Sequence, residues 1–261
     1  MAGRQIVLRM DDVGSCVSAN LAVLECARAG CAKNASLMVP GPAFEHAANL
    51  LGGNPELCFG LHVVLNAEWD TVKWGPVVGP TRVPSLCEAS GAFTSEPRVL
   101  HVRGFSLDEA ETEIRAQLAK AREAGFEIRY MDEHMGVGWL NGLSDRLAEI
   151  AQEEGLVFRP KLEYPALETT LVPGSSPDEQ AAARARALLD SLDRAGDGPF
   201  LYVTHPGLDA PDMQAFAHAG LAPGSVARER DLDRRMLSSP ELREGLERLG
   251  IRSLRYDELS N

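Results

Sequence analysis

Short apolar runs alternate with amphipathic stretches along most of the chain. Runs such as Gln5–Met10, Leu57–Leu65 and Pro199–Thr204 have the length and composition of strands buried within a sheet. Stretches such as Leu107–Gly125 and Pro177–Gly196 carry a charged face and predict surface helices. Strands that alternate with helices in this way predict a mainly parallel sheet or barrel.

About seven strand–helix units follow one another without a clear break, and the chain of 261 residues has about the length of an α/β barrel. We therefore expect a single barrel-like α/β domain over residues 1–261. Residues 66–104 are expected to be irregular and residues 207–226 to form a loop. Further strands are expected at residues 35–39, 127–132, 156–159 and 251–254, and further helices at residues 20–30, 42–51, 143–155 and 240–250.

The charge balance narrows the function classes. The chain carries 38 acidic and 26 basic residues, a net charge of −12, which argues against binding to nucleic acid or to an anionic membrane surface. No apolar stretch reaches the roughly 18 residues of a membrane-spanning helix, and the first residues lack the apolar core of a signal peptide. With five cysteines and no CxxC motif, we expect a cytoplasmic protein with reduced thiols. A homodimer is the default assembly.

An acidic doublet, Asp11-Asp12, follows the first apolar run directly. Buried aspartates are rare unless they are paired or bind a metal. Neighbouring side chains of a strand point to opposite faces, so both acids reach one site only where the chain leaves the strand. Gly14 permits such a departure. The alternative is a helix cap and a solvated acid before a helix that begins near Val17.

Three histidines also stand at or just beyond strand ends. His62 lies within an apolar run, where the alternative is a core histidine that bonds a backbone carbonyl. In Tyr130-Met131-Asp132-Glu133-His134, the strand period places Asp132 and His134 on one face; this fits a metal-binding histidine with a nearby acid, or a simple Asp–His hydrogen bond. His205 is held extended by the proline after it, although Pro-Gly is also common in plain turns.

All these groups fall at the edge of the sheet where parallel α/β folds carry their active sites. One carboxylate and two imidazoles are a standard ligand set for a catalytic divalent ion with an open position for water. A further carboxylate and a further histidine then remain for proton transfer. The groups are Asp11-Asp12, His62, Asp132 with His134, Arg159 and His205.

Taken in order, these motifs resemble those of the YdjC-like (ChbG-like) carbohydrate deacetylases. The resemblance spans nearly the whole chain. The matching pieces are Met10-Asp11-Asp12-Val13-Gly14, Ser36-Leu37-Met38-Val39, Gly60-Leu61-His62-Val63-Val64-Leu65, Gln117, Tyr130-Met131-Asp132-Glu133-His134, Phe158-Arg159-Pro160, Thr204-His205-Pro206-Gly207, Arg228-Glu229-Arg230-Asp231-Leu232 and Leu237-Ser238-Ser239-Pro240.

The resemblance implies a distorted (β/α) barrel, one divalent metal ion, zinc or magnesium, and hydrolysis of the amide C–N bond of an N-acetylated sugar or short oligosaccharide. It implies that Asp11 is the general base and His205 the general acid or the stabiliser of the intermediate. It further implies that Asp132 orients a group beside the metal and that Arg159 positions a base or the substrate. The implied metal ligands are Asp12, His62 and His134.

Two departures from the family pattern concern the pocket. Arg9 and Val13 stand where the family commonly has Asn or His and an aromatic residue, and Gly136 replaces a common second histidine, which bears on the substrate range. Trp139 is a candidate for stacking on a sugar ring, although packing is the commoner role of such aromatic side chains. Two alternative functions are another metal-dependent sugar-processing barrel enzyme, such as an isomerase, and a catalytically silent metal-binding or sugar-binding protein.

Overall fold

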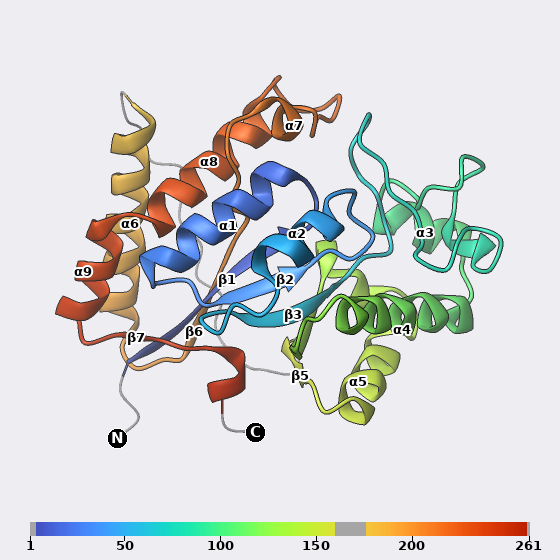
Figure 1. Cartoon of the computed structure of the whole chain (residues 1–261), viewed down its shortest axis with the longest axis horizontal. Helices are drawn as coiled ribbons and strands as arrows, with labels where there is room; N and C mark the ends of the chain where they lie inside the picture. Colours follow the sequence, from blue (N-terminus) through green and yellow to red (C-terminus); the bar gives the residue numbers. More distant parts are fainter. Residues whose placement is uncertain (1–3, 160–175, 260–261) are drawn as a thin grey trace.

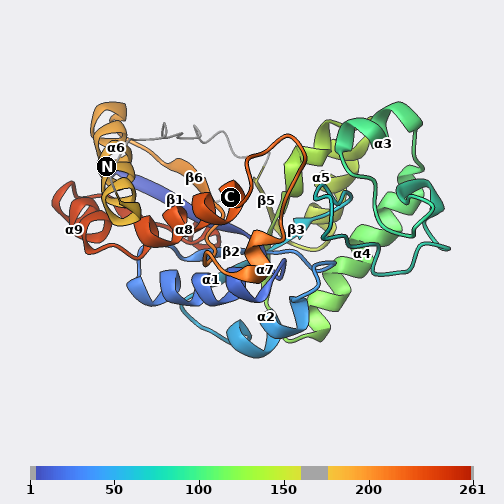
Figure 2. The same cartoon turned by 90° about the horizontal axis from the view of Figure 1, so that it is seen from above.

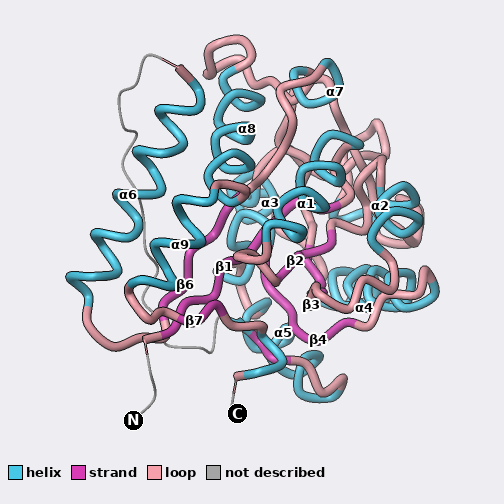
Figure 3. The backbone as a smooth tube through the Cα atoms, turned by 60° about the vertical axis from the view of Figure 1, so that its left-hand side comes forward, coloured by secondary structure: helices cyan, strands magenta, loops and turns pink. Residues whose placement is uncertain are grey.

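Parallel strands form the centre of the protein in a computed structural model that describes residues 4–159 and 176–259. Their order along the sheet is β5-β4-β3-β2-β1-β6, and β7 pairs with the start of β1. The sheet curls into a half-barrel (Figure 3), as expected for a distorted α/β barrel. The strands are β1 Gln5–Val13, β2 Asn34–Leu37, β3 Cys58–Val63, β4 Ile128–Glu133, β5 Val157–Phe158, β6 Phe200–Thr204 and β7 Arg252–Ser253.

Helices lie around the outside of the curled sheet, with α6, α8 and α9 towards one end and α4 and α5 towards the other (Figures 1 and 2). No helix within the described ranges is both long enough and apolar enough to cross a membrane. The helices are α1 Val17–Ala29, α2 Phe44–Leu51, α3 Pro97–Arg103, α4 Leu107–Glu123, α5 Leu143–Glu153, α6 Pro177–Ala195, α7 Pro211–Gln214, α8 Ser225–Leu237 and α9 Pro240–Arg248, with 3-10 turns at Pro84–Leu86, His134–Trp139 and Tyr256–Glu258.

The first strand separates an apolar side from a polar side. Ile6, Leu8 and Met10 belong to the large core that includes the helices, whereas Val7 packs in a second, smaller cluster inside the half-barrel. The period of two places Arg9 on the same inner side as Val7. Both sides are buried, which explains why β1 reads as a nearly continuous apolar run.

Gly60 allows a polar network to cross the inside of the sheet. Ser36, Gly60 and Tyr130 are in register on β2, β3 and β4. The hydroxyl groups of Tyr130 and Ser36 lie 2.8 Å apart, so the tyrosine ring passes over the strand between them. A Cβ atom on Gly60 would lie 2.2 Å from that ring. The missing side chain of Gly60 therefore makes room for the support of the candidate site.

The sequence prediction missed three helices. Helix α3 lies within residues 66–104, which were expected to be irregular. The short α7 lies within the expected loop 207–226, and α8 begins at the end of that loop. The buried side chains of α8 include Arg230, Asp231 and Asp233 as well as apolar residues. A helix that buries charged side chains lacks the clear apolar stripe on which such predictions rest.

Replacement of Gly60 by alanine tests the tyrosine crossing. We expect Gly60→Ala to lower the free energy of unfolding by about 1–3 kcal/mol, the usual effect of overpacking, because the Tyr130 ring is fully buried and bonded beyond the glycine. Chemical denaturation measures the change, with Gly220→Ala in an exposed turn as the control. Equal stability of Gly60→Ala and the wild type would contradict this account.

Candidate active site

The acidic doublet sits where β1 breaks its regular pairing. Asp12 has a φ of 61°, and the register with β2 shifts between Met10 and Val13. A left-handed residue within a strand turns the following side chains, so both acids face one site despite being neighbours. The sequence predicted that the chain leaves the strand at Gly14. In the structure the change of direction already begins at Asp12. Both aspartates are 3% exposed, so neither is a solvated acid.

Three potential ligand atoms form a small triangle around Asp12. Its Oδ1 lies 3.4 Å from Nε2 of His62 and 3.2 Å from Nδ1 of His134. The two nitrogens are 3.1 Å apart, and all three side chains are buried. The Oδ1 atom accepts no hydrogen bond in the described chain. An orphaned, buried carboxylate oxygen beside two imidazole nitrogens is a donor set suited to a cation.

The size of the triangle fits a divalent ion. A tetrahedral zinc ion with bonds of about 2.0–2.1 Å separates its ligand atoms by roughly 3.3–3.4 Å. An octahedral magnesium ion with similar bonds separates neighbouring ligand atoms by roughly 2.9–3.0 Å. The distances among Asp12, His62 and His134 run from 3.1 to 3.4 Å and suit either geometry. Three protein ligands leave at least one position open.

Each histidine is oriented by a carboxylate on its other nitrogen. Nδ1 of His62 lies 2.7 Å from Oδ1 of Asp132, which is its register partner on β4. Nε2 of His134 lies 3.0 Å from Oε2 of Glu68. A carboxylate on one ring nitrogen fixes the proton there and leaves the other nitrogen free to bind a metal. Asp132 thus pairs with His62 and not with His134, its neighbour on the same expected face.

Arg9 links the two acids that lie next to the triangle. Its guanidinium donates to both oxygens of Asp11, over 2.6 and 2.7 Å, and its Nε lies 2.9 Å from Oδ2 of Asp132. Burial alone raises the pKa of Asp11, but the charge and hydrogen bonds of Arg9 outweigh it and lower that pKa. Asp11 therefore stays ionised at neutral pH.

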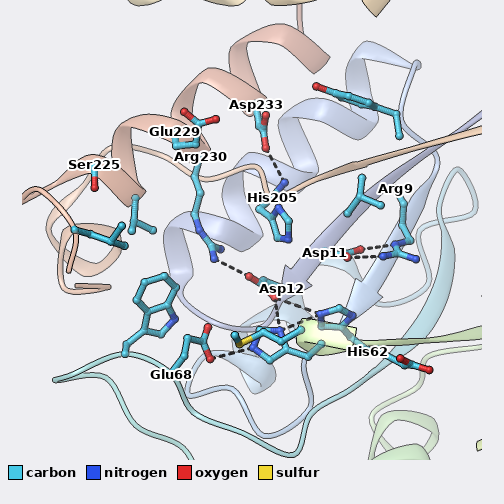
Figure 4. A pocket seen from close by; sticks show the side chains of 18 of the residues that line it. Arg9, Asp11, Asp12, His62, Glu68, His205, Ser225, Glu229, Arg230 and Asp233 are labelled. Atoms are coloured by element: carbon cyan, nitrogen blue, oxygen red, sulfur yellow. Dashed lines mark hydrogen bonds and ion pairs between the residues drawn. The ribbon is translucent and has the colours of Figure 1, made fainter. Parts of the chain in front are cut away.

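His205 and Arg230 complete the site from the side of β6 and α8 (Figure 4). The backbone N–H of His205 donates to Oδ2 of Asp233 over 2.8 Å, and Arg184 donates to the other oxygen of Asp233 over 2.6 Å. Arg230 reaches from α8 and donates to Oδ2 of Asp12 over 2.7 Å. The two oxygens of Asp12 thus face different groups.

A cavity of about 930 Å³ opens over these side chains. Its described lining includes five residues that the sequence predicted for the site: Asp11, Asp12, His62, His134 and His205. It also includes charged residues without a predicted role, namely Arg9, Glu68, Glu133, Arg184, Glu229, Arg230 and Asp233. Arg159 and Trp139 are not among the lining residues. Trp139 is 53% exposed and its ring contacts that of His101. Arg9 donates to Asp11, the proposed base, and the role of Arg159 stays a prediction.

Sequence reasoning missed three groups of this site. Glu68 lies in the irregular region 66–104, where no periodicity marks it. Arg230 and Asp233 lie on α8. The family resemblance included Arg230 in the piece Arg228–Leu232 without giving it a role, and it did not include Asp233.

Gly136, which replaces the second histidine of the family pattern, has a φ of 61° after a φ of 50° at Met135. These two left-handed residues turn the chain directly after His134.

Comparisons with known proteins identify the family and the fold of this chain. The sequence profile of the YdjC-like protein family matches residues 5–248. A carbohydrate deacetylase of Brevibacillus brevis is 26% identical and covers 98% of this chain and 99% of its own; one of Geobacillus stearothermophilus is 28% identical and covers 98% of both chains. The crystal structure of an Enterococcus faecalis protein, described as a cellobiose-phosphate cleavage protein, has the same fold, with a TM-score of 0.80 at 19% identity over 99% of this chain and 100% of its own.

The buried histidines predict a pH-dependent stability of the metal-free protein. Burial lowers the pKa of His62, but Asp132 and other carboxylates outweigh it and raise that pKa to about 10; Glu68 and Asp12 likewise outweigh burial and raise the pKa of His134 to about 9. Stabilisation by the protonated rings is complete below the unfolded pKa of about 6.5 and is lost as the pH rises through the folded values. We expect the free energy of unfolding to fall from about pH 7 to pH 10.

Chemical denaturation of chelator-treated protein measures this slope, and the double variant His62→Gln His134→Gln is the control that should lack it. Binding of a divalent ion must displace these protons. Calorimetry in buffers of different ionisation enthalpy should therefore detect proton release on metal addition at pH 7. A flat stability profile in the wild type, or metal binding without proton release, would contradict the assigned pairs.

Glu68 should tune the metal affinity although it lies outside the triangle. In Glu68→Gln the side chain keeps its size, but the charge that holds the proton on Nε2 of His134 is lost. We expect a 10–100-fold weaker affinity for zinc, the usual effect of removing such a partner. Isothermal titration with zinc measures it. Glu88→Gln, at an exposed acid of the same region, should bind as the wild type does; equal loss in both variants would argue against a specific role.

Proposed function

We propose that this chain, which belongs to the YdjC-like family, is a metal-dependent hydrolase that removes the acetyl group from an N-acetylated sugar. The observation that carries the proposal is the triangle of Asp12, His62 and His134 with an ionised Asp11 beside it and His205 on the same cavity. The full-length likeness to proteins named carbohydrate deacetylase supports the same reaction. The substrate is an acetamido sugar or a short oligosaccharide.

In this proposal Asp12, His62 and His134 hold one divalent ion. When bound, zinc or magnesium supplies Lewis acidity, which polarises the acetyl carbonyl and lowers the pKa of water, in the zinc case to about 7. Asp132 and Glu68 keep the two imidazoles in the tautomers that present a lone pair to the ion. The mixed nitrogen and oxygen set accommodates both metals.

Asp11 takes the proton of the attacking water. Arg9 bonds one lone pair of each Asp11 oxygen, and a carboxylate oxygen retains further acceptor capacity. The lowered pKa of Asp11 keeps it ready as a proton acceptor at neutral pH. Arg9 also fixes the carboxylate in place, which limits the reorganisation needed when the water binds.

His205 protonates the amine that leaves. An amine without this proton is a poor leaving group, so amide hydrolysis requires an acid on the side of the nitrogen. His205 lines the same cavity as the ligand triangle, and the bond from its backbone to Asp233 fixes its position at the end of β6. Its extended backbone before Pro206 directs the ring into the cavity.

The alternatives predicted from sequence receive less support. No lysine is among the described residues that line the cavity, whereas a metal-dependent sugar isomerase usually needs a catalytic lysine and more carboxylate ligands. A silent binding protein needs neither Asp11 nor His205 in the cavity. The half-buried Trp69 lines the cavity, while Trp139 does not, so Trp69 is the better candidate for stacking on a sugar ring.

Paired variants of the doublet test the division of roles. We expect Asp11→Asn to keep its metal but to release acetate from N-acetylated mono- and disaccharides about 10²–10⁴-fold more slowly, because the base is lost. Asp12→Ala should lose both the metal and the activity, because a ligand is lost. Metal analysis, acetate assays and thermal unfolding of both variants make the comparison. Equal metal loss in the two folded variants would refute the assigned roles.

A further inference from the structure

Arg230 carries an N–H donor that no described residue uses. The side chain is 7% exposed, and its NH2 group donates to Oδ2 of Asp12 over 2.7 Å. Its NH1 atom is buried without a hydrogen-bond partner. Leaving such a donor unpaired is unfavourable, and Arg230 lines the cavity, so its unpaired N–H indicates an oxygen ligand that is supplied from outside the chain.

Two other buried arginines line the same cavity, and in both of them each terminal nitrogen has a partner. Arg9 bonds both oxygens of Asp11 and contacts the hydroxyl of Tyr256. Arg184 divides its two terminal nitrogens between Asp233 and Glu229. Of these three arginines, Arg230 is therefore the one with a terminal nitrogen that has no hydrogen-bond partner among the described residues.

Three side chains, those of Asp12, Trp69 and Phe216, restrict where the NH1 group of Arg230 points. The guanidinium group is planar and rigid, so NH1 must lie beside the NH2 that bonds Asp12. The rings of Trp69 and Phe216 lie 5.9 and 5.8 Å from the guanidinium carbon and restrict its rotation. Figure 4 shows Arg230 extending from α8 towards Asp12. An oxygen that accepts from NH1 therefore lies next to a carboxylate of the ligand triangle.

We propose that Arg230 is a further catalytic residue, whose NH1 group donates to the acyl oxygen of the acetyl group as negative charge collects on it. The proposal rests on the proposed function and adds a residue to it. Oδ1 of Asp12 has no hydrogen-bond partner, whereas Oδ2 accepts from NH2 of Arg230. The same guanidinium group carries the unpartnered NH1. One buried ion pair thus carries both an unpartnered carboxylate oxygen and an unpartnered guanidinium nitrogen.

The reaction develops negative charge that such a donor can stabilise. A water oxygen forms a bond to the acetyl carbon, and the electron pair of the carbonyl moves onto the acyl oxygen. The pair then returns, the C–N bond breaks, Asp11 holds the proton lost by water, and His205 gives a proton to the nitrogen. The immediate products are acetic acid, which ionises to acetate, and a free amino sugar. Asp11 then loses its proton and His205 regains one, both by exchange with solvent. Arginine remains protonated throughout, so it stabilises the charge without exchanging a proton.

Acetate itself should therefore bind at this donor. Acetate is the product, and its two oxygens are the former acyl oxygen and the oxygen of the attacking water. Hydrogen bonds between guanidinium and carboxylate are among the stronger ones in proteins. An acidic substituent on the sugar is the other ligand with this chemistry. In that case Arg230 would contribute to substrate binding and not to the chemical step. Its loss would then raise KM and leave kcat unchanged, whereas loss of a donor to the acyl oxygen lowers kcat.

The kinetic test uses the metal-loaded enzyme with Arg230→Lys. Lysine keeps the charge beside Asp12 but has no second nitrogen in a fixed fork. We expect kcat to fall about 10²–10³-fold, the usual effect of losing one donor to an oxyanion, with KM within about threefold of wild type and the metal content unchanged. Arg228→Lys, on the exposed face of the same helix, should retain wild-type kcat.

A second measurement does not depend on turnover. Isothermal titration of the metal-loaded proteins with sodium acetate should give about tenfold weaker binding in Arg230→Lys than in wild type or Arg228→Lys. If Arg230→Lys fails to fold or to bind metal, the folded Arg230→Ala variant supplies the test, because added methylguanidinium should then restore activity. Restoration by methylguanidinium but not by methylammonium supports the fork as the required group.

Three results would overturn the proposal. These are a kcat within fivefold of wild type in metal-loaded Arg230→Lys, a loss that resides wholly in KM, or an unchanged acetate affinity. A wild-type enzyme that releases no acetate from any acetamido sugar would instead overturn the proposed function, and the acetate titration would still decide whether Arg230 forms an anion site.

Discussion

The carboxylate of Asp12 is the group on which the rest of the site depends. It is 3% exposed, and burial of an ionised carboxylate is unfavourable unless other groups compensate its charge. Arg230 compensates one oxygen, while the other faces His62 and His134 without a hydrogen bond. Burial raises the pKa of Asp12, but Arg230 and the two imidazoles outweigh it and hold that pKa well below its usual value. A cation on the free oxygen would complete the compensation.

The fold creates this situation through ordinary features of a parallel sheet. The strands of a parallel sheet end at one edge, so residues at or just beyond the ends of β1, β3, β4 and β6 meet although they are far apart in sequence. The left-handed backbone of Asp12 adds the second acid to the same side. Beneath it, the pairing of Arg9 with Asp11 and Asp132 and the bond from Ser36 to Asp132 hold the acids in place. Gly60 gives Tyr130 the room to join this network.

Much of this arrangement could be predicted from the sequence, because it depends on strands. The apolar runs before Asp11-Asp12 and His205, and the run that contains His62, located both the sheet and the side chains at its edge. Glu68 could not be predicted, since it follows no periodicity and finds His134 only through the tertiary fold. Helix α8 was missed for a related reason: it buries Arg230 and Asp233 against the site, and these charges hide the apolar stripe of a helix. The groups that tune the site are thus harder to predict than those that form it.

The most direct test of the central claim is the structure of the metal-loaded protein, with the ion identified by anomalous diffraction. The account predicts one ion bonded to Oδ1 of Asp12, Nε2 of His62 and Nδ1 of His134, at about 2.0–2.2 Å for zinc, with at least one further position open to the cavity. An ion bound elsewhere in the chain, or bound through Asp11 and Asp132 in place of Asp12, would contradict it.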